Sequence, residues 1–267
     1  MALGDEEVIS LPFRYVICGL ACLPTSALFL CVLCALLLHY DKATETHCGV
    51  DNWLPSVSAA VSTFAPEKYI WRVLLGLHGG PRFIFAVANR NYLVSSPLQP
   101  LQNTAIFKTM CNVACFIHIF ENIFLLLLTA ISSVENHELH KICFGIFGAS
   151  ALVYMCLSTY LFSYSGRRRA LSSNIGEKSF EYKCLFAGIS FLSMILAGYL
   201  YYRHNMYCET GVYTLFALAE YFIILSNIAF HLTLYYDFQG KSLTIGASSS
   251  SFQYQLLPMH ERRNREE

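Results

Sequence analysis

Charged residues are scarce in this sequence. Asp, Glu, Lys and Arg make up 13% of its 267 residues, whereas a typical soluble domain has about 25%. Hydrophobic residues reach 55%, and the mean hydropathy is +0.45. This composition excludes an ordinary soluble domain and indicates an integral membrane protein. The formal net charge is zero, so no basic excess is present to attract a nucleic acid.

Familiar catalytic and metal-binding motifs are missing as well. The sequence contains no His-Glu-x-x-His, no Gly-x-Ser-x-Gly and no set of Cys-x-x-Cys pairs at the spacing of a zinc site. We therefore expect no metal and no cofactor, and no motif identifies a catalytic residue. Asn-x-Ser/Thr acceptors are also absent, so we expect no N-linked glycan.

Long apolar runs dominate the remainder. Each run has about 20 residues or more, which is the length that crosses a hydrocarbon core about 30 Å thick. Six runs cover residues 15–39, 69–93, 105–133, 139–163, 183–202 and 212–236. Their lack of polar alternation favours helices over a β-barrel. We predict an all-α polytopic membrane protein, with a single bundle of six transmembrane helices in residues 1–238 and a disordered cytosolic tail in residues 239–267.

The positions of basic residues predict the orientation of the bundle. Twelve of the eighteen Lys and Arg residues lie in the N-terminal segment, the second and fourth loops, and the tail, whereas four lie in the first, third and fifth loops. Because cytoplasmic segments carry the excess of Lys and Arg, both termini are predicted to face the cytosol.

The first and fifth loops, on the opposite side, contain Cys48 and Cys208. A disulfide persists in an oxidising compartment, so we predict that these two residues are bridged, with two free thiols as the alternative. The first loop also carries Trp53 among turn-forming residues, and we expect it to lie on or dip into the membrane interface.

Polar side chains within the predicted spans are the main candidates for function. Such groups are costly in lipid and persist where they pair or line a cavity. They are Arg72, His78 and Arg82 in the second span, His118, Glu121 and Asn122 in the third, and Glu220, Asn227 and His231 in the sixth. Helical spacing places polar stripes on three helices, which predicts a shared polar cavity. The alternative is that these residues only lock the bundle.

Two buried ion pairs are expected within this cavity, Arg82 with Glu121 and Arg72 with Glu220. Pro81 kinks the second span and creates a polar notch beside His78. Two further histidines, His137 and His140, lie at the mouth between the third and fourth spans. They could ligate a metal, although solvated loop histidines are the commoner explanation.

Four stretches carry a resemblance to a known family. They read THCGVDNWLPSVSAAVS, YIWRVLLGLHGGPRF, ENIFLLLLTAISSVENHELH and YYRHNMYCETGVYTLFALAEYFIILSNIAFHLTLYYDF. Across residues 46–238 the chain resembles members of the FRAG1/DRAM/Sfk1 family that act after attachment of the glycosylphosphatidylinositol (GPI) anchor. The resemblance implies fatty-acid remodelling of GPI anchors in the Golgi membrane, with the endoplasmic reticulum as a second location. The reaction implied is reacylation of the sn-2 position of a lyso-GPI intermediate with a saturated chain.

On this hypothesis the chain is a membrane-embedded O-acyltransferase whose acyl donor the sequence does not identify. Its expected partners are lyso-GPI lipid, GPI-anchored proteins, membrane lipids and other GPI-remodelling enzymes. His78 is the preferred general base, and an arginine or Asn122 steadies the oxyanion. The expected catalytic set is His78, Arg82, His118, Glu121, Asn122, Glu220 and His231, with Arg72, Trp53 and Arg203 as substrate-binding residues. The alternatives are a non-catalytic scaffold that presents lipid to a remodelling enzyme, and a lipid scramblase.

Overall fold

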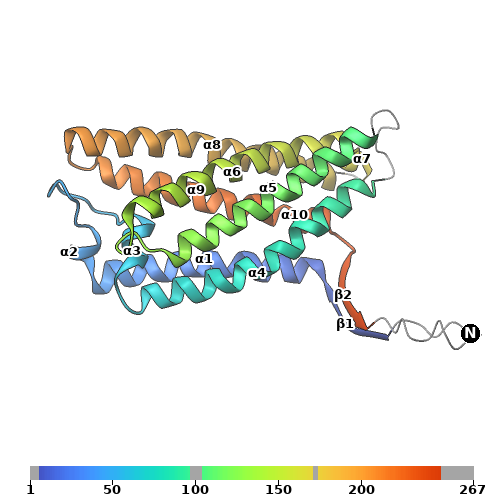
Figure 1. Ribbon diagram of the computed structural model, residues 1–267, viewed down its shortest axis with the longest axis horizontal. Helices are drawn as coiled ribbons and strands as arrows, with labels where there is room; N and C mark the ends of the chain where they lie inside the picture. The colour runs from blue at the N-terminus through green and yellow to red at the C-terminus, as the bar shows by residue number, and fades with distance from the viewer. Residues whose placement is uncertain (1–5, 97–103, 171–173, 248–267) are drawn as a thin grey trace, which may run out of the picture.

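The computed structural model describes residues 6–96, 104–170 and 174–247 of the chain. Long helices lie side by side along one axis and form a single bundle (Figure 1). They are α1 (Phe13–Leu38), α4 (Glu67–Val94), α5 (Thr104–Ala130), α6 (His137–Tyr164), α8 (Ile175–Tyr207) and α9 (Val212–Leu232). The predicted all-α bundle is thus observed, apart from one short pair of strands.

Five helical segments in the described ranges are long and apolar enough to cross a membrane, by length and composition. They are α1, α5, α6, α8 and the segment Val212–Asp237, which joins α9 to the short helix α10 (Leu234–Asp237). Helix α4 has 28 residues and the same length along the bundle, but it is not one of these five segments. It packs against both α1 and α5.

Short helices mark the two ends of the bundle. Helices α2 (Tyr40–Ala43) and α3 (Val57–Ser62) lie at the end where the chain passes from α1 to α4, and α7 (Arg167–Ala170) lies at the other. Helix α3 begins where the Ser56 side chain accepts a hydrogen bond from the Ala59 N–H at 3.2 Å. Helix α6 begins in the same way at Asn136, which accepts from the Leu139 N–H at 3.0 Å. Side-chain caps of this kind satisfy backbone donors that the first helical turn leaves free.

Strands β1 (Glu6–Pro12) and β2 (Ser242–Ala247) pair antiparallel beyond the end opposite α3 (Figure 1). The Phe13 N–H donates to the Lys241 carbonyl at 3.0 Å and continues this pairing to the start of α1. The prediction of disorder from residue 239 is therefore wrong for residues 242–247. Their alternation of polar and apolar residues suits a strand, and β1 satisfies their backbone hydrogen bonds. The rest of the predicted disordered tail, residues 248–267, lies outside the described residues.

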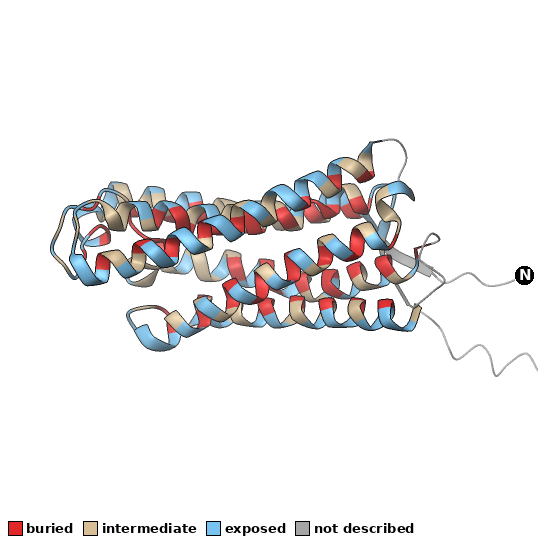
Figure 2. Ribbon diagram, turned by 90° about the horizontal axis from the view of Figure 1, so that it is seen from above, coloured by how far each residue is buried: buried red, intermediate tan, exposed pale blue. Residues whose placement is uncertain are grey.

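The outer faces of the bundle are apolar. Buried residues line the inner faces of the helices, and exposed residues cover the outside (Figure 2). The exposed side chains include Leu37, Phe116 and Leu192, which are more than half exposed. A belt of exposed leucine, isoleucine and phenylalanine is the surface expected of a chain that is surrounded by lipid.

A disulfide joins Cys48 to Cys208, so it connects the segment between α2 and α3 to the end of α8. Hydrogen bonds extend this attachment, because the Gly211 N–H donates to the Asp51 carbonyl at 3.1 Å and the Trp53 N–H donates to Thr214 Oγ1 at 3.0 Å. Trp53 packs beside Gly211, whose φ of +78° favours glycine. These contacts hold α3 against the start of α9. We call this end of the bundle the disulfide end and the other the strand end.

The first prediction concerns the disulfide. Replacing Cys48 by Ser should lower the melting temperature of the purified full chain by at least about 4 °C, because loss of a disulfide typically costs about 2–4 kcal/mol. The double variant Cys48→Ser/Cys208→Ser should melt at the same temperature as the single variant. Cys156→Ser, at a free and exposed cysteine, is the matched control. Equal melting temperatures for the wild type and both bridge variants would show that the bridge contributes nothing to stability.

Candidate functional site

A buried ion pair lies deep in the bundle. Arg82 Nη2 of α4 donates to Glu121 Oε1 of α5 at 2.9 Å, and the two side chains are 5% and 0% exposed. Asn227 of α9 donates to the same carboxylate oxygen at 3.0 Å. The Arg82 guanidinium also donates to His231 Nε2 at 2.6 Å, because arginine has no acceptor atom. The expected pair between Arg82 and Glu121 is thus present, and it joins three helices.

Further polar residues extend this cluster. The His118 ring stacks on the rings of Tyr154 and His231, with centroid distances of 4.3 Å and 4.7 Å. Asn122 Nδ2 donates to the Gly79 carbonyl of α4 at 2.8 Å. A Cβ atom on Gly79 would lie 2.5 Å from Leu126 Cδ2, so a larger residue there would have to displace the Leu126 side chain between α4 and α5. We call Arg82, His118, Glu121, Asn122, Asn227 and His231 the deep polar cluster.

His78 lies beside the deep polar cluster and faces α1. Its Nδ1 is 2.9 Å from the carbonyl oxygen of Leu20 and therefore carries a proton that it donates. His78 and Arg82 line one cavity on the side of α3 and another beneath α1. In the region of the polar notch expected beside Pro81, His78 contacts α1, and Arg82 contacts α5 and α9.

Three members of the deep polar cluster have the composition of a metal site. Donor atoms of His118, Glu121 and His231 all lie within 4.8 Å of one another. The Arg82 guanidinium, however, already contacts both Glu121 and His231. A cation at this position would have to displace a buried positive charge. The arrangement therefore fits an ion-pair cluster better than a metal site.

The expected pair between Arg72 and Glu220 is wrong. Glu220 Oε2 accepts from the Val57 N–H at 2.9 Å and so binds the start of α3. Arg72 instead pairs with Glu135 at 3.2 Å, where both side chains are partly exposed. The Ser132 backbone N–H and the Arg72 guanidinium lower the pKa of the Glu135 carboxyl. The sequence indicated that Arg72 and Glu220 lie near the same end of the bundle. It could not show that each has a closer partner, Glu135 for Arg72 and the α3 backbone for Glu220.

The other two expected substrate-binding residues lie away from the cavities described here. Arg203 pairs with Glu209 at the end of α8 and lies over the rings of Tyr199 and Tyr207. Trp53 packs on the turn before α9 and is 56% exposed. Of the three, Arg72 is the one that lines a cavity.

A serine and a histidine at the disulfide end form a pair that no sequence motif predicted. Ser58 Oγ of α3 lies 2.8 Å from His140 Nε2 of α6, and His140 Nδ1 lies 2.7 Å from the Ile131 carbonyl oxygen. The carbonyl can only accept, so Nδ1 carries the proton and Nε2 accepts from the Ser58 hydroxyl. His140 is buried, whereas His137 is exposed, so the explanation of both as solvated loop histidines is wrong for His140.

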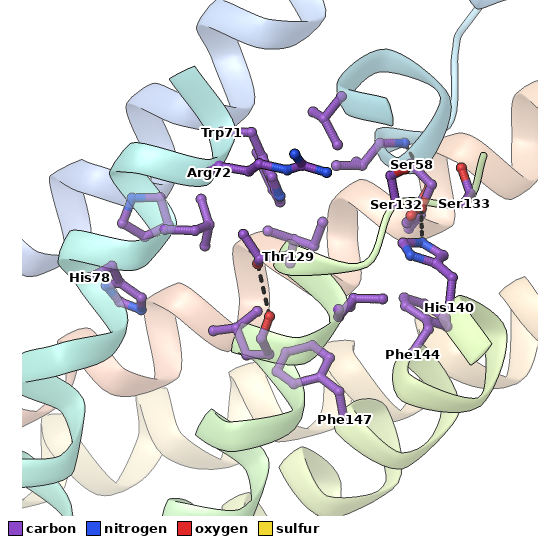
Figure 3. Close-up of a pocket in the computed structure, with 18 of the residues that line it drawn as sticks. Ser58, Trp71, Arg72, His78, Thr129, Ser132, Ser133, His140, Phe144 and Phe147 are labelled. Carbon is purple, nitrogen blue, oxygen red and sulfur yellow. Dashed lines mark hydrogen bonds between the residues drawn. The ribbon is translucent and has the colours of Figure 1, made fainter. Parts of the chain in front are cut away.

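The Ser58–His140 pair lies between two cavities. The inner cavity, about 60 Å³, is lined by Ser58, Arg72, Ser132 and His140 at its polar end and extends to His78 and Arg82 (Figure 3). Its walls are apolar and include Leu75, Leu125, Leu128, Phe144, Phe147 and Ile224. The outer cavity, about 370 Å³, shares Ser58, His140 and Glu220 with the inner one and is also lined by Tyr201, Tyr213 and Phe216. Figure 3 shows Ser58 and His140 pointing toward each other.

Comparison with known proteins assigns most of the chain to one domain. The domain described as "Frag1/DRAM/Sfk1/Cwh43P N-terminal domain" matches residues 12–241. The chain is 58% identical to "Post-GPI attachment to proteins factor 2" of Caenorhabditis briggsae, over 97% of each chain. It is 38% identical to "Acyltransferase PGAP2" of Xenopus tropicalis, over 91% of this chain and 94% of the relative. No solved structure matches the chain.

The second prediction concerns the deep ion pair. Arg82→Ala should sharply reduce the amount of monodisperse full-length protein, because leaving Glu121 buried and unpaired typically costs about 3–5 kcal/mol. Adding Glu121→Gln to Arg82→Ala should restore much of that amount, since it removes the unpaired charge. Fluorescence-detected size-exclusion chromatography of tagged protein measures both.

Arg72→Ala is the matched control, because its exposed pair with Glu135 should contribute at most about 1 kcal/mol. A double variant as depleted as Arg82→Ala alone would show that the unpaired Glu121 charge is not the cause of the loss.

Proposed function

We propose that this chain, which belongs to the Frag1/DRAM/Sfk1/Cwh43P family, acts in the maturation of GPI anchors. Relatives that match it over most of their length are named for a step after GPI attachment, and two vertebrate relatives are named acyltransferases. The reaction proposed is reacylation of the sn-2 position of a lyso-GPI intermediate with a saturated chain. The earlier resemblance on four stretches is confirmed by the match over residues 12–241.

The observation that carries the acyltransferase proposal is the hydrogen bond between Ser58 and His140. Acyl transfer to an alcohol needs a base within hydrogen-bond reach of the hydroxyl that loses its proton. His140 Nε2 is such an acceptor, 2.8 Å from a hydroxyl oxygen, and the Ile131 carbonyl fixes its tautomer. His140 therefore replaces His78 as the proposed base, because the His78 ring lies deeper and donates to a carbonyl of α1.

The two cavities suit the two parts of the substrates. The outer cavity, about 370 Å³, falls within the range of about 300–1,000 Å³ typical of ligand pockets, and its mainly apolar lining includes polar groups, among them Ser133 and Lys141, that a lipid headgroup can contact. The inner cavity has the apolar walls that an acyl chain needs, but at about 60 Å³ it must widen to admit one. Arg72 stands at its polar end, where a lipid phosphate can replace Glu135 as its partner.

The proposed topology places this site on the lumenal side. Helix α4 is the sixth span, and both termini face the cytosol, as the distribution of Lys and Arg predicts. The disulfide end then faces the oxidising lumen of the Golgi or the endoplasmic reticulum. GPI-anchored proteins and their lyso-GPI lipid are exposed on that side, as is any remodelling enzyme that works on the same lipid. No cofactor or metal takes part in the proposed step.

The deep polar cluster has a different proposed role. The contacts of Arg82 with Glu121 and His231, and of Asn122 with the Gly79 carbonyl, hold α4 in the bundle. Arg82 also lines the inner cavity at its deep end. Another member of the predicted catalytic set, Glu220, holds α3 in place through the Val57 N–H. We therefore propose that these residues support the site and do not themselves perform the chemistry.

A lipid-presenting scaffold is the second candidate function. A groove of about 720 Å³ between α1, α8 and α9 opens on the apolar outer face of the bundle. Its lining is mainly apolar and includes Phe29, Phe186, Phe222 and Leu225. A groove of this kind can hold a lipid chain without any reaction.

The third prediction tests the acyltransferase directly. Purified full-length protein in liposomes, given lyso-GPI together with acyl-CoA or diacyl phospholipid as donor, should produce diacylated GPI, measured by lipid mass spectrometry. His140→Ala should reduce the rate by about 100-fold or more, because it removes the base, while leaving protein abundance close to that of the wild type.

His47→Ala is the matched control, since His47 is an exposed histidine at the same end of the bundle and lines neither cavity. Wild-type protein that binds lyso-GPI but transfers no chain from any donor would favour the scaffold. Equal rates for His140→Ala and His47→Ala would exclude His140 as the base.

A further inference from the structure

We propose that Ser58 carries the acyl chain as a covalent ester between two half-reactions. This inference rests on the proposed acyltransferase function and adds a nucleophile to it. The acyl group passes first from the donor to Ser58 Oγ and then from Ser58 to the 2-hydroxyl of the lyso-lipid. The alternative mechanism is a direct transfer, in which His140 deprotonates the lipid hydroxyl and Ser58 forms no bond to the acyl group.

The geometry at Ser58 is that of an activated hydroxyl. A nucleophile of this kind is recognised by a base within hydrogen-bond reach and a third group that orients the base. His140 Nε2 is 2.8 Å from Ser58 Oγ, and the Ile131 carbonyl oxygen is 2.7 Å from His140 Nδ1. The carbonyl takes the orienting position that a carboxylate has in the serine–histidine–aspartate arrangement.

Other hydroxyl groups along the inner cavity have different partners. Thr129 donates to the Leu125 carbonyl at 2.8 Å, and Ser62 donates to the Ala59 carbonyl at 3.4 Å. The Ser132 hydroxyl accepts from the Glu135 backbone N–H at 3.3 Å. Among the described hydroxyls that line this cavity, Ser58 is the one that is hydrogen-bonded to a histidine.

Helix α3 holds Ser58 in a fixed position. The preceding residues are fastened to α9, because the Val57 N–H donates to Glu220 Oε2 at 2.9 Å and Tyr221 donates its hydroxyl to the Pro55 carbonyl at 2.6 Å. Tyr213 also reaches the Ser56 hydroxyl at 3.4 Å. A nucleophile that neighbouring elements hold rigidly is ready to react without a further ordering step.

The position of Ser58 between two cavities suits a reaction in two steps. Both the inner and the outer cavity include Ser58 and His140 in their lining. A chain held in the apolar inner cavity can therefore remain attached to Ser58 while one alcohol leaves the outer cavity and another enters. The first alcohol or thiol is the donor's leaving group, and the second is the lyso-lipid.

Each half-reaction conserves atoms and protons. In the first, Ser58 Oγ attacks the carbonyl carbon of an ester or thioester donor, and His140 Nε2 takes the hydroxyl proton. The bond between the acyl carbon and the leaving oxygen or sulfur breaks, and that atom takes the proton from His140. In the second, the lipid 2-hydroxyl attacks the Ser58 ester and gives its proton to His140, which returns it to Ser58 Oγ. No oxidant, reductant or metal is required.

The test is to find the ester itself. Purified full-length protein in liposomes is incubated with stearoyl-CoA or distearoyl phosphatidylcholine in the absence of lyso-GPI, quenched in acid and analysed by peptide mass spectrometry. We expect one stearoyl group on the peptide that contains Ser58, and its loss when lyso-GPI is added. Ser58→Ala should form no adduct, and its transfer rate should be at least about 99% lower than that of the wild type.

Thr63→Ala, at the exposed end of α3 and outside the lining of both cavities, is the matched control and should keep both adduct and transfer. Ser58→Cys should form a thioester that neutral hydroxylamine cleaves, which separates a chemical role of residue 58 from a merely structural one. Because the adduct is measured on the wild type, the test does not depend on the folding of any variant.

The outcomes separate this inference from the proposed function. Transfer by the wild type without a Ser58 adduct, or transfer by Ser58→Ala within threefold of the wild type, overturns the inference and leaves the acyltransferase intact. An adduct on Ser58 with no transfer to lyso-GPI supports the inference and contradicts the proposed acceptor. Wild-type protein that forms no adduct and transfers no chain overturns both.

Discussion

A guanidinium and a carboxylate that are buried together inside the bundle constrain the rest of this structure. Arg82 and Glu121 are almost completely removed from solvent, and either charge left alone in an apolar environment would be strongly unfavourable. Helix α4, which carries Arg82, is therefore acceptable in the bundle only beside α5 and α9, which supply Glu121, Asn227 and His231. The pair thus determines which helices must be neighbours.

The cavity follows from this arrangement. Its deep end is formed by the same helices that carry the ion pair, and its other end is closed by α3 and the start of α6. Helix α3 has only six residues, so its position depends on attachments at both sides, the disulfide at Cys48 and the contacts with α9. The residues that stabilise the bundle and the residues of the candidate site therefore lie in different parts of the structure. Buried charges hold the helices together in the interior, and the serine–histidine pair lines the outer cavity at the disulfide end.

Much of the interior could be predicted because it depends on local rules. Apolar runs of spanning length predicted the helices, and helical spacing predicted the faces on which Arg82 and Glu121 meet. The position of Cys48 and Cys208 on one side predicted the bridge that the structure contains. These features can be predicted from the hydrophobic periodicity, the charges and the compartment that each loop faces. Whether the deep polar cluster takes part in chemistry stays a prediction.

Other features could not be predicted because they depend on long-range contacts. Ser58 and His140 are 82 residues apart and belong to no local motif. Glu220 binds the backbone of α3, and backbone donors are not visible as charges in a sequence. Arg72 pairs with Glu135 and not with the expected Glu220. The pairing of β1 with β2 likewise joins the two ends of the described chain, although the composition of the C-terminal tail favoured disorder.

The most direct test of the account is to map where the lipid binds. Full-length protein in native-like membranes is irradiated with a photoactivatable lyso-phosphatidylinositol that carries its reactive group near the sn-2 hydroxyl, and the labelled peptides are sequenced. The account predicts adducts at the disulfide end, in residues 56–62, 131–144 and 194–220, which include the lining of the outer cavity. Adducts confined to the groove formed by α1, the middle of α8 and the later part of α9 would contradict it.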